Sequence, residues 1–451
     1  MATLPEDFVR EINCFDGLAE TLATTKPSVS VRLNPAKPSD AFDGCRQVAW
    51  YNRGRYLDNR PRFTLDPALH QGAYYVQDAS SMFLAHAISR LGLQRPVAWL
   101  DACAAPGGKS TLALDCLPEG SLVVANEAVP VRAAVLRENI IKWGNPNAIV
   151  TRGDAVCFGE LGPTFDVIAA DVPCSGEGMM RKEPEAIAQW SRGLVAECSA
   201  RQQRLTEALW QALKPGGYMI YSTCTFNRDE NEEIVSRLVS RYGAEPVDLS
   251  PDPAWGIIGG VETDIPCYHL LPGRVEGEGQ FMAVLRKPSD TSSPSERSGR
   301  RHKPTPRQAK ADPRAAEWLS DSALASMTHT VDGDRINAFT TQWLPLLERL
   351  SDRKMPDIIH HGTPVASVKG RDLVPSHALA MATGIVSDSA FSRVETDVDT
   401  ALQYLRGEAV SVDAPRGHVM LTYGGLPLGF VKNLGNRANN MYPRDWRIRH
   451  M

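Results

Sequence analysis

Residues 97–110 read VAWLDACAAPGGKS, a short apolar run that passes into a glycine-containing turn and then into the start of a helix. The run predicts a buried strand, and Gly107 and Gly108 permit a turn in which a ligand can approach the backbone beside a helix N-terminus. Further apolar runs lie at 122–125, 148–151, 167–170, 218–222 and 281–285. They alternate with longer amphipathic stretches such as 194–213. This alternation predicts a doubly wound α/β domain around a mostly parallel sheet.

The glycine turn has a rival interpretation as a phosphate-binding P-loop, because Gly108-Lys109-Ser110 resembles the end of that motif. The motif requires a glycine five residues before Gly108, and Cys103 stands there. The segment does not match Gly-x-Gly-x-x-Gly either. A P-loop NTPase is therefore excluded, and the turn remains a candidate site for another nucleotide-like cofactor.

Acidic side chains follow successive predicted strands. Glu127 stands about 20 residues beyond the turn, where a carboxylate can accept hydrogen bonds from both hydroxyls of a ribose. Asp154 follows the third strand, where it could accept from an adenine amino group, and Asp171 follows the fourth. A single acid at a strand end is more often a helix cap. Three acids in register with a glycine turn favour a cofactor site.

Two cysteines follow the fourth and fifth predicted strands, Cys174 in DVPCSGEG and Cys224 in STCTF. Most buried cysteines are small, inert core residues. These two stand at loop entries on the ligand side of the sheet, which favours reactive thiols. The chain has nine cysteines and no Cys-x-x-Cys pair, which argues against a disulfide framework and a zinc site.

The composition indicates a multidomain globular protein. The chain has 451 residues, of which 43% are hydrophobic and 23% charged, and it has no apolar run long enough to cross a bilayer. The start has no secretory signal pattern, so we expect a cytoplasmic protein with no membrane contact, and we expect a monomer. The net charge is -4, so any affinity for nucleic acid must come from local basic patches.

Three motifs together carry a family resemblance: DACAAPGGK at 101–109, DVPCSG at 171–176 and STCT at 222–225. They resemble, in the same order, the motifs of the Sun family of RNA cytosine-5 methyltransferases, in particular its RsmF branch of bacterial 16S rRNA methyltransferases. Further matches lie at 32–37, 72–81 and 277–281. The resemblance implies a Rossmann-like class I methyltransferase domain, S-adenosyl-L-methionine as the cofactor, no metal, and RNA of the small ribosomal subunit as the substrate.

The resemblance also implies roles for single residues. It makes Cys224 the nucleophile and Cys174 the group that assists product release, whereas DNA cytosine-5 methyltransferases attack from their Pro-Cys cysteine. Having both motifs points to RNA and not DNA. The residues implied for the cofactor site are Cys103, Ala104, Ala105, Pro106, Gly107, Gly108, Lys109, Glu127, Asp154 and Asp171.

The chemistry explains why two thiols are needed. Carbon 5 of cytosine is weakly nucleophilic, and addition of a thiolate to carbon 6 turns the ring into an enamine with electron density on carbon 5. After methyl transfer, the proton on carbon 5 and the thiolate must both leave, which requires a base or a group that assists release. Asp171 suits an interaction with ring nitrogen 3, and Lys109 suits stabilisation of the base.

Changes in composition divide the chain into five parts. We predict an N-terminal α+β RNA-binding region at 1–90, the methyltransferase domain at 91–286, a flexible linker at 287–313, a small α/β region at 314–392, and a PUA-like RNA-binding domain at 393–451. The linker is polar and rich in Pro and Ser. Its cations could touch phosphates or simply be solvated; they are Arg297, Arg300, Arg301, His302 and Lys303.

Basic and aromatic residues are interleaved in both flanking regions, as in proteins that pair with phosphates and stack on unpaired bases. The aromatic residues could equally pack in small cores. The residues concerned are Arg53, Arg55, Arg60, Arg62, Tyr51, Tyr56 and Phe63 near the N-terminus, and Tyr442 and Trp446 near the C-terminus.

The substrate should be a structured RNA with an accessible or flipped cytosine, because a thiol cannot reach carbon 6 of a stacked base. Two other functions stay open. One is a transfer-RNA cytosine-5 methyltransferase of the same superfamily, and the other is a non-catalytic RNA-binding factor for ribosome assembly. Comparing the methylation of transfer RNA with that of small ribosomal subunits separates the three.

Overall fold

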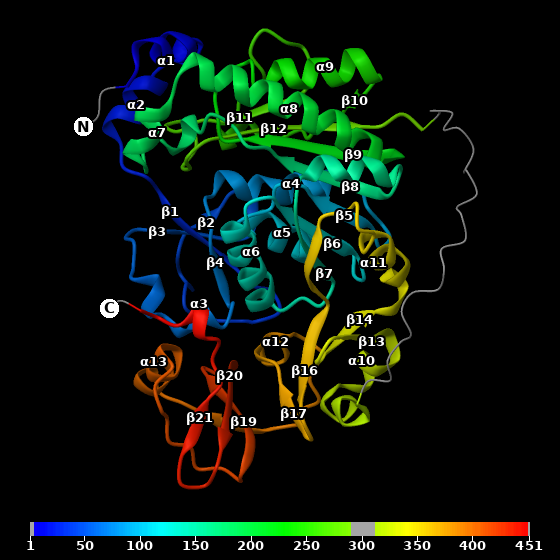
Figure 1. The fold of residues 1–451 in the computed structure, drawn as a ribbon. Helices are drawn as coiled ribbons and strands as arrows, with labels where there is room; N and C mark the ends of the chain where they lie inside the picture. The colour runs from blue at the N-terminus through cyan, green and yellow to red at the C-terminus, as the bar shows by residue number, and fades with distance from the viewer. Residues whose placement is uncertain (1–3, 290–311, 450–451) are drawn as a thin grey trace.

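The computed structural model describes residues 4–289 and 312–449 (Figure 1). Most of the predicted linker, including the cations from Arg297 to Lys303, lies outside the described residues. Within the two described ranges no helix is long and apolar enough to cross a membrane.

A nine-stranded sheet forms the centre of the molecule, with the order β10-β12-β9-β8-β5-β6-β7-β15 and with β11 paired to β12. Its strands are β5 (Ala98–Asp101), β6 (Leu122–Glu127), β7 (Ala148–Arg152), β8 (Phe165–Asp171), β9 (Leu213–Thr223), β10 (Glu245–Pro246), β11 (Tyr268–Leu270), β12 (Gln280–Arg286) and β15 (Asp357–His361). Strands β5 to β9 are parallel, and β10, β11, β12 and β15 pair antiparallel. The predicted α/β domain with a mostly parallel sheet is confirmed.

Helices cover both faces of this sheet, because successive residues of each buried strand point to opposite sides. The helices are α4 (Phe83–Arg90), α5 (Gly108–Cys116), α6 (Pro130–Trp143), α8 (Arg192–Ala212), α9 (Glu232–Tyr242) and α11 (Leu344–Leu350), with the 3-10 helix η4 (Ala155–Leu161). The short helix α7 (Pro184–Gln189) packs instead against the N-terminal helices. Trp99 of β5 packs in one core with residues of α4, α5 and α6. Its neighbour Leu100 packs in the other core with residues of α8, α9 and α11.

The N-terminal region adds a four-stranded sheet of order β2-β3-β1-β4. Its elements are α1 (Glu6–Glu11), α2 (Leu18–Thr24), β1 (Val29–Leu33), β2 (Gln47–Val48), β3 (Tyr51–Leu57), α3 (Pro67–His70) and β4 (Tyr74–Val76). Tyr51, Tyr56 and Phe63 are buried, so these aromatic residues pack in the core and are not available to stack on bases. Arg53, by contrast, is exposed.

The C-terminal part contains two further four-stranded sheets, of orders β13-β14-β16-β17 and β18-β19-β20-β21, seen in the lower half of Figure 1. Their elements are α10 (Asp321–Ser326), β13 (Met327–Asp332), β14 (Arg335–Thr340), β16 (Thr363–Lys369), β17 (Asp372–Pro375), α12 (His377–Met381), β18 (Ser392–Glu395), α13 (Val398–Arg406), β19 (Gly417–Tyr423), β20 (Leu426–Asn433), β21 (Ala438–Asn440) and the 3-10 helix η9 (Arg444–Trp446). Tyr442 is buried.

Strand β15 is a feature that the sequence did not indicate. It follows the predicted linker along the chain, yet it pairs antiparallel with β7 at the edge of the central sheet, Ile358 opposite Thr151 and His361 opposite Ile149. The C-terminal half is therefore attached to the methyltransferase sheet by backbone hydrogen bonds.

Candidate active site

A cleft of about 640 Å³ opens where the parallel strands end. Strand β5 lies between β6 and β8, so the connections leave in opposite directions at this point, where α/β sheets usually bind ligands. Of the predicted site residues, those that line the cleft are Cys103, Ala105, Glu127, Asp154, Asp171, Cys174 and Cys224. The others do not line it; they are Ala104, Pro106, Gly107, Gly108 and Lys109.

The glycine turn is held by hydrogen bonds to its backbone. Gly107 has φ +113° and caps the N-terminus of α5, a conformation that favours glycine. The Arg132 guanidinium donates to Ala105 O at 3.0 Å, and the Asn139 amide donates to Pro106 O at 2.8 Å. The turn is thus attached to α6, the next helix.

The N-terminal sheet supports the same turn from the other side through Arg32. The Arg32 side chain is fully buried, and its guanidinium donates to Asp115 Oδ2 and Thr111 Oγ1, both at 2.5 Å. It also lies over the Trp143 ring, 4.2 Å from the centroid. The match at 32–37 therefore marks a contact that fixes α5 and α6 beneath the cleft.

The acids at the strand ends have different surroundings. Glu127 is buried, and its Oε1 accepts from the Val129 backbone at 2.9 Å while Arg132 lies 3.5 Å from Oε2. Asp154 is exposed and accepts from the Val156 backbone at 3.1 Å, so it caps η4 as well as lining the cleft. Asp154 is therefore a helix cap that also lines the cleft, and its contact with an adenine amino group stays a prediction.

Asp101, at the end of β5, is a fully buried acid behind the turn. Ser110 Oγ donates to its Oδ2 at 2.6 Å, and within the described part of the chain its Oδ1 has no hydrogen-bond partner. Burial raises the pKa of this carboxyl to about 7. Its ionised form is therefore disfavoured in the folded protein.

The two cysteines of the predicted site lie side by side. Their Sγ atoms are 3.4 Å apart, with Cys174 on the loop after β8 and Cys224 directly after β9. The hydrogen bond to Cys224, followed by burial, raises the pKa of Cys174 well above its ordinary value. Cys174 therefore stays protonated, and its S–H group can donate a hydrogen bond to Cys224 Sγ.

An ion pair lies beside the thiols. Lys109 Nζ is 2.9 Å from Asp171 Oδ2, and Ser222 Oγ donates to Asp171 Oδ1 at 2.7 Å. Burial alone would lower the pKa of Lys109, but the charge of Asp171, the hydrogen bond to Asp171 and smaller contributions from Cys224 and Asp101 together outweigh burial and raise the pKa. Lys109 is thus held as a cation beside Asp171.

Sequence reasoning missed a buried network that supports the loop of Cys174. The Glu230 carboxylate accepts from Ser175 N at 3.0 Å, from the Gln202 amide at 2.8 Å and from the Asn227 amide at 2.8 Å. Gln202 also donates to Pro173 O at 3.0 Å. These residues come from distant segments, and no local pattern marks them as partners.

Three arginines that the sequence did not single out also line the cleft: Arg132 from α6, and Arg201 and Arg204 from α8. They give the mouth of the cleft positive charge although the whole chain is acidic. Their helical spacing indicated only an amphipathic surface, and their shared position appears only when α6 and α8 flank the same strand ends.

Family models match three parts of the chain. The model described as 16S rRNA methyltransferase RsmB/F matches residues 89–286, that of the N-terminal domain of 16S rRNA methyltransferase RsmF matches 4–79, and that of the methyltransferase RsmF PUA domain matches 391–448.

Curated relatives are similar over most of their length. Ribosomal RNA small subunit methyltransferase F of Shewanella loihica is 32% identical, covering 83% of this chain and 78% of its own. The protein of the same name from Vibrio vulnificus is 31% identical, covering 92% of this chain and 90% of its own.

Among solved structures, a methyltransferase homolog protein from Pyrococcus horikoshii matches with a TM-score of 0.51 and 25% identity, covering 63% of this chain and 100% of that one. NSun6 from Pyrococcus horikoshii with SFG has the same fold, with a TM-score of 0.53, 19% identity, and coverage of 63% of this chain and 98% of that one. The fold, the three matched regions and the full-length relatives agree: the chain belongs to the RsmF family of small-subunit ribosomal RNA methyltransferases.

Proposed function

We propose that this enzyme methylates carbon 5 of a cytosine in 16S rRNA of the small ribosomal subunit, through a covalent bond between Cys224 and carbon 6. The observation that carries the proposal is the pair of thiols, 3.4 Å apart, in the cleft that Asp171 also lines, with Lys109 paired to Asp171 behind it. The names of the relatives support the choice of RNA. The position of both thiols just beyond the carboxyl ends of β8 and β9 supports the covalent cysteine mechanism.

The cleft fits S-adenosyl-L-methionine. Carboxylates at two strand ends, Glu127 and Asp154, can accept hydrogen bonds from ribose hydroxyls and an adenine amino group, and Val156 and Leu205 give the same wall an apolar surface for a ring. Asp171 also lines the cleft, where its side chain can attract the positively charged sulfonium of the cofactor. When bound, this cofactor supplies an electrophilic methyl group. We assign Cys103, Ala105, Glu127, Asp154 and Asp171 to holding it.

Cys224 is the better placed nucleophile because its neighbour supplies a hydrogen bond. The Cys174 thiol keeps its proton, since its pKa is raised, and can donate to a thiolate on Cys224 across 3.4 Å. The new bond joins Cys224 Sγ to carbon 6, and the electron pair of the ring double bond moves onto carbon 5 and toward nitrogen 3. We assign Asp171, which lines the cleft, and Lys109, which pairs with it, to binding the polar edge of the base.

Release reverses the addition. When carbon 5 carries the methyl group, its proton leaves to a general base, and the electron pair of that C–H bond re-forms the ring double bond. The bond from carbon 6 to Cys224 breaks, and Sγ takes the bonding pair. Cys174 assists this step because its S–H can donate to the departing thiolate, and the Glu230 network keeps the Cys174 loop in place.

The test is incubation of the protein with labelled S-adenosyl-L-methionine and small ribosomal subunits, followed by nucleoside mass spectrometry. We expect 5-methylcytosine with the wild type and none with Cys224→Ala, whose cofactor affinity should stay unchanged in calorimetry. Cys157→Ala, a half-buried cysteine on η4, is the control and should keep full turnover. Continued turnover by Cys224→Ala would contradict the proposal.

The same assay separates the alternatives. Label in transfer RNA and not in small subunits would keep the cysteine chemistry and change the substrate. Label in neither RNA would favour a non-catalytic assembly factor. The preference for RNA over DNA and the monomeric state stay predictions.

A further inference from the structure

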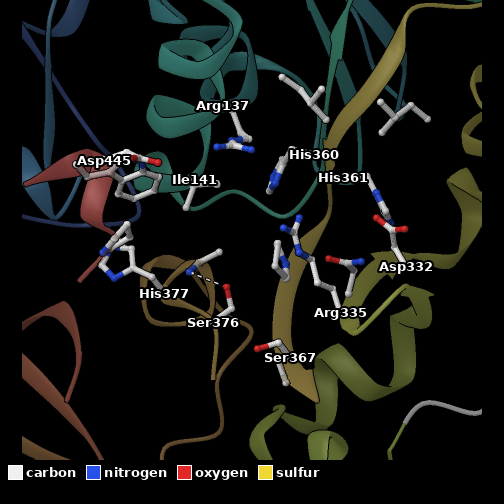
Figure 2. A pocket seen from close by; sticks show the side chains of 18 of the residues that line it. Arg137, Ile141, Asp332, Arg335, His360, His361, Ser367, Ser376, His377 and Asp445 are labelled. Carbon is white, nitrogen blue, oxygen red and sulfur yellow. Dashed lines mark hydrogen bonds between the residues drawn. The ribbon is translucent and has the colours of Figure 1, made fainter. Parts of the chain in front are cut away.

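A second pocket, of about 620 Å³, lies outside the catalytic cleft, between α6, β14, β15, α12 and η9 (Figure 2). We call it the α6–β15 pocket. Its lining includes Arg137, Arg335, His360, His377 and Trp446. It joins the methyltransferase domain to both C-terminal sheets, and neither the matched family models nor the proposed function assigns it a role.

Two arginines point into this pocket without a carboxylate partner. Figure 2 shows the side chains of Arg137, from α6, and Arg335, from β14, extending toward the middle of the pocket. Among the described residues neither guanidinium has a carboxylate within ion-pair distance. Asp332 and Asp445 also line the pocket, but Figure 2 shows them at its opposite ends. The centre of the pocket is therefore cationic.

The histidines of the pocket carry no charge of their own. Burial lowers the pKa of His360 and that of His377 to about 3, and burial also lowers the pKa of His361. Both ring nitrogens of His377 are buried and have no hydrogen-bond partner among the described residues. The His377 ring is packed against Tyr442 and Trp446, so it contributes an uncharged wall to the pocket.

One side of the pocket, next to Arg137, offers a flat and apolar surface. Trp446 is half-buried, packs edge-on against His377 with ring centroids 5.3 Å apart, and carries Lys142 Nζ 5.3 Å from its ring centroid. Ile141 lies one turn after Arg137 on α6 and also lines the pocket. A cationic centre beside an aromatic and apolar wall is the combination that binds a phosphate together with its base.

The pocket is close to the catalytic cleft because two elements reach both. On α6, Arg132 lines the cleft and Arg137 lines the pocket, five residues apart, which is about 7.5 Å along the helix axis and about 140° around it. Strand β15 begins next to the cleft, since a side chain on Gly153 would contact Pro356 at 2.9 Å, and its residues 358–361 line the pocket. A single strand of RNA can therefore span the two sites in a few nucleotides.

We propose that the α6–β15 pocket is a second RNA site, which binds one nucleotide of the substrate a few positions from the target base. Arg137 and Arg335 bind its phosphate, and the wall of Trp446 and Ile141 receives its base. The inference rests on RNA being the substrate, but not on the cysteine chemistry. The site would fix which cytosine reaches Cys224.

The test compares Arg137→Gln/Arg335→Gln with a matched pair of exposed arginines that line neither site, Arg90→Gln/Arg353→Gln. Affinity for a fluorescein-labelled single-stranded oligoribonucleotide is measured by anisotropy over a range of salt concentrations. Loss of this one phosphate contact should reduce the slope of log K against log salt by about 0.7, which is about 5-fold in affinity at 0.1 M salt. Arg137→Lys/Arg335→Lys should restore the slope.

Kinetics give a second readout. KM for the RNA should rise with the loss of affinity, whereas kcat at saturating RNA and the affinity for S-adenosyl-L-methionine should not change. An oligonucleotide affinity and salt slope equal to those of the control pair would overturn the inference. A binding defect without any 5-methylcytosine from the wild type would support the pocket and overturn the proposed reaction, so the two failures are distinguishable.

Discussion

At the scale of single residues, the position of Cys174 makes a prediction about release. Its thiol lies 3.4 Å from Cys224 Sγ, and because its pKa is raised it is still protonated when the bond between carbon 6 and Cys224 Sγ breaks. Cys174→Ala removes that donor but leaves Cys224 in place. We expect it to accumulate a covalent complex between protein and RNA, visible as a retarded band on a denaturing gel.

The double variant Cys174→Ala/Cys224→Ala is the control for this complex. It has no nucleophile, so the band should disappear. Free turnover by Cys174→Ala, with no accumulated complex, would argue that another group assists release.

Asp101 makes a prediction about pH. Its carboxyl has a pKa of about 7 in the folded protein because of burial, against 3.8 as the ordinary value. Between these values the folded state binds a proton that the unfolded state has lost, so this group's contribution to stability is present below pH 4 and lost as pH rises through 7. Asp101→Asn, which cannot titrate, should therefore gain stability relative to the wild type between pH 4 and 8, by up to about 4 kcal/mol.

Urea denaturation at pH 5 and pH 8 measures the difference. Glu119→Gln, at an exposed acid, is the control and should follow the wild type at both values. If Asp101→Asn and Glu119→Gln change the free energy of unfolding by the same amount at both pH values, Asp101 is ionised in the folded protein at neutral pH.

At the scale of elements, helix α5 depends on a residue 80 positions earlier in the chain. Arg32 is buried against Asp115 and Thr111 of α5 and against Trp143 of α6. Arg32→Met leaves the Asp115 carboxyl buried without its cation, which typically costs 3–5 kcal/mol. We expect a lower urea midpoint and weaker cofactor binding, because α5 carries the glycine turn at its N-terminus.

A second substitution checks the reason for that loss. Adding Asp115→Asn to Arg32→Met removes the unpaired charge and should recover part of the stability. No recovery would mean that packing against Trp143, and not the ion pair, is what Arg32 contributes.

The elements of the central sheet were predictable because their signals are local. The apolar runs at 122–125 and 148–151 fall within β6 and β7, and the stretch 194–213 closely matches α8, Arg192–Ala212. The apolar run at 218–222 is only the end of its strand, since β9 begins at Leu213 and includes Lys214-Pro215-Gly216-Gly217. The ladder to β8 shifts register at this point, which accommodates the glycines in a strand.

At the scale of the whole molecule, the sequence predicted which strand ends meet but not what surrounds them. Glu127, Asp171 and Cys224 were found because a parallel sheet places its carboxyl ends at one edge. Glu230 and the α6–β15 pocket were not, because each joins residues from distant segments whose partners no period or motif reveals. The sequence also left open whether the N-terminal aromatic residues stack on bases or pack in a core. Their burial shows that they pack in a core.

Strand β15 has a consequence for how the protein behaves when its chain is cut. The C-terminal half supplies β15, the strand at one edge of the central sheet. It also contacts the methyltransferase domain through the Arg349 guanidinium, which donates a hydrogen bond to Leu161 O at 2.8 Å. A polypeptide ending before residue 290 would leave β7 as an open edge, prone to self-association. Expressed together as two separate chains, the halves should instead complement each other and purify as one non-covalent heterodimer.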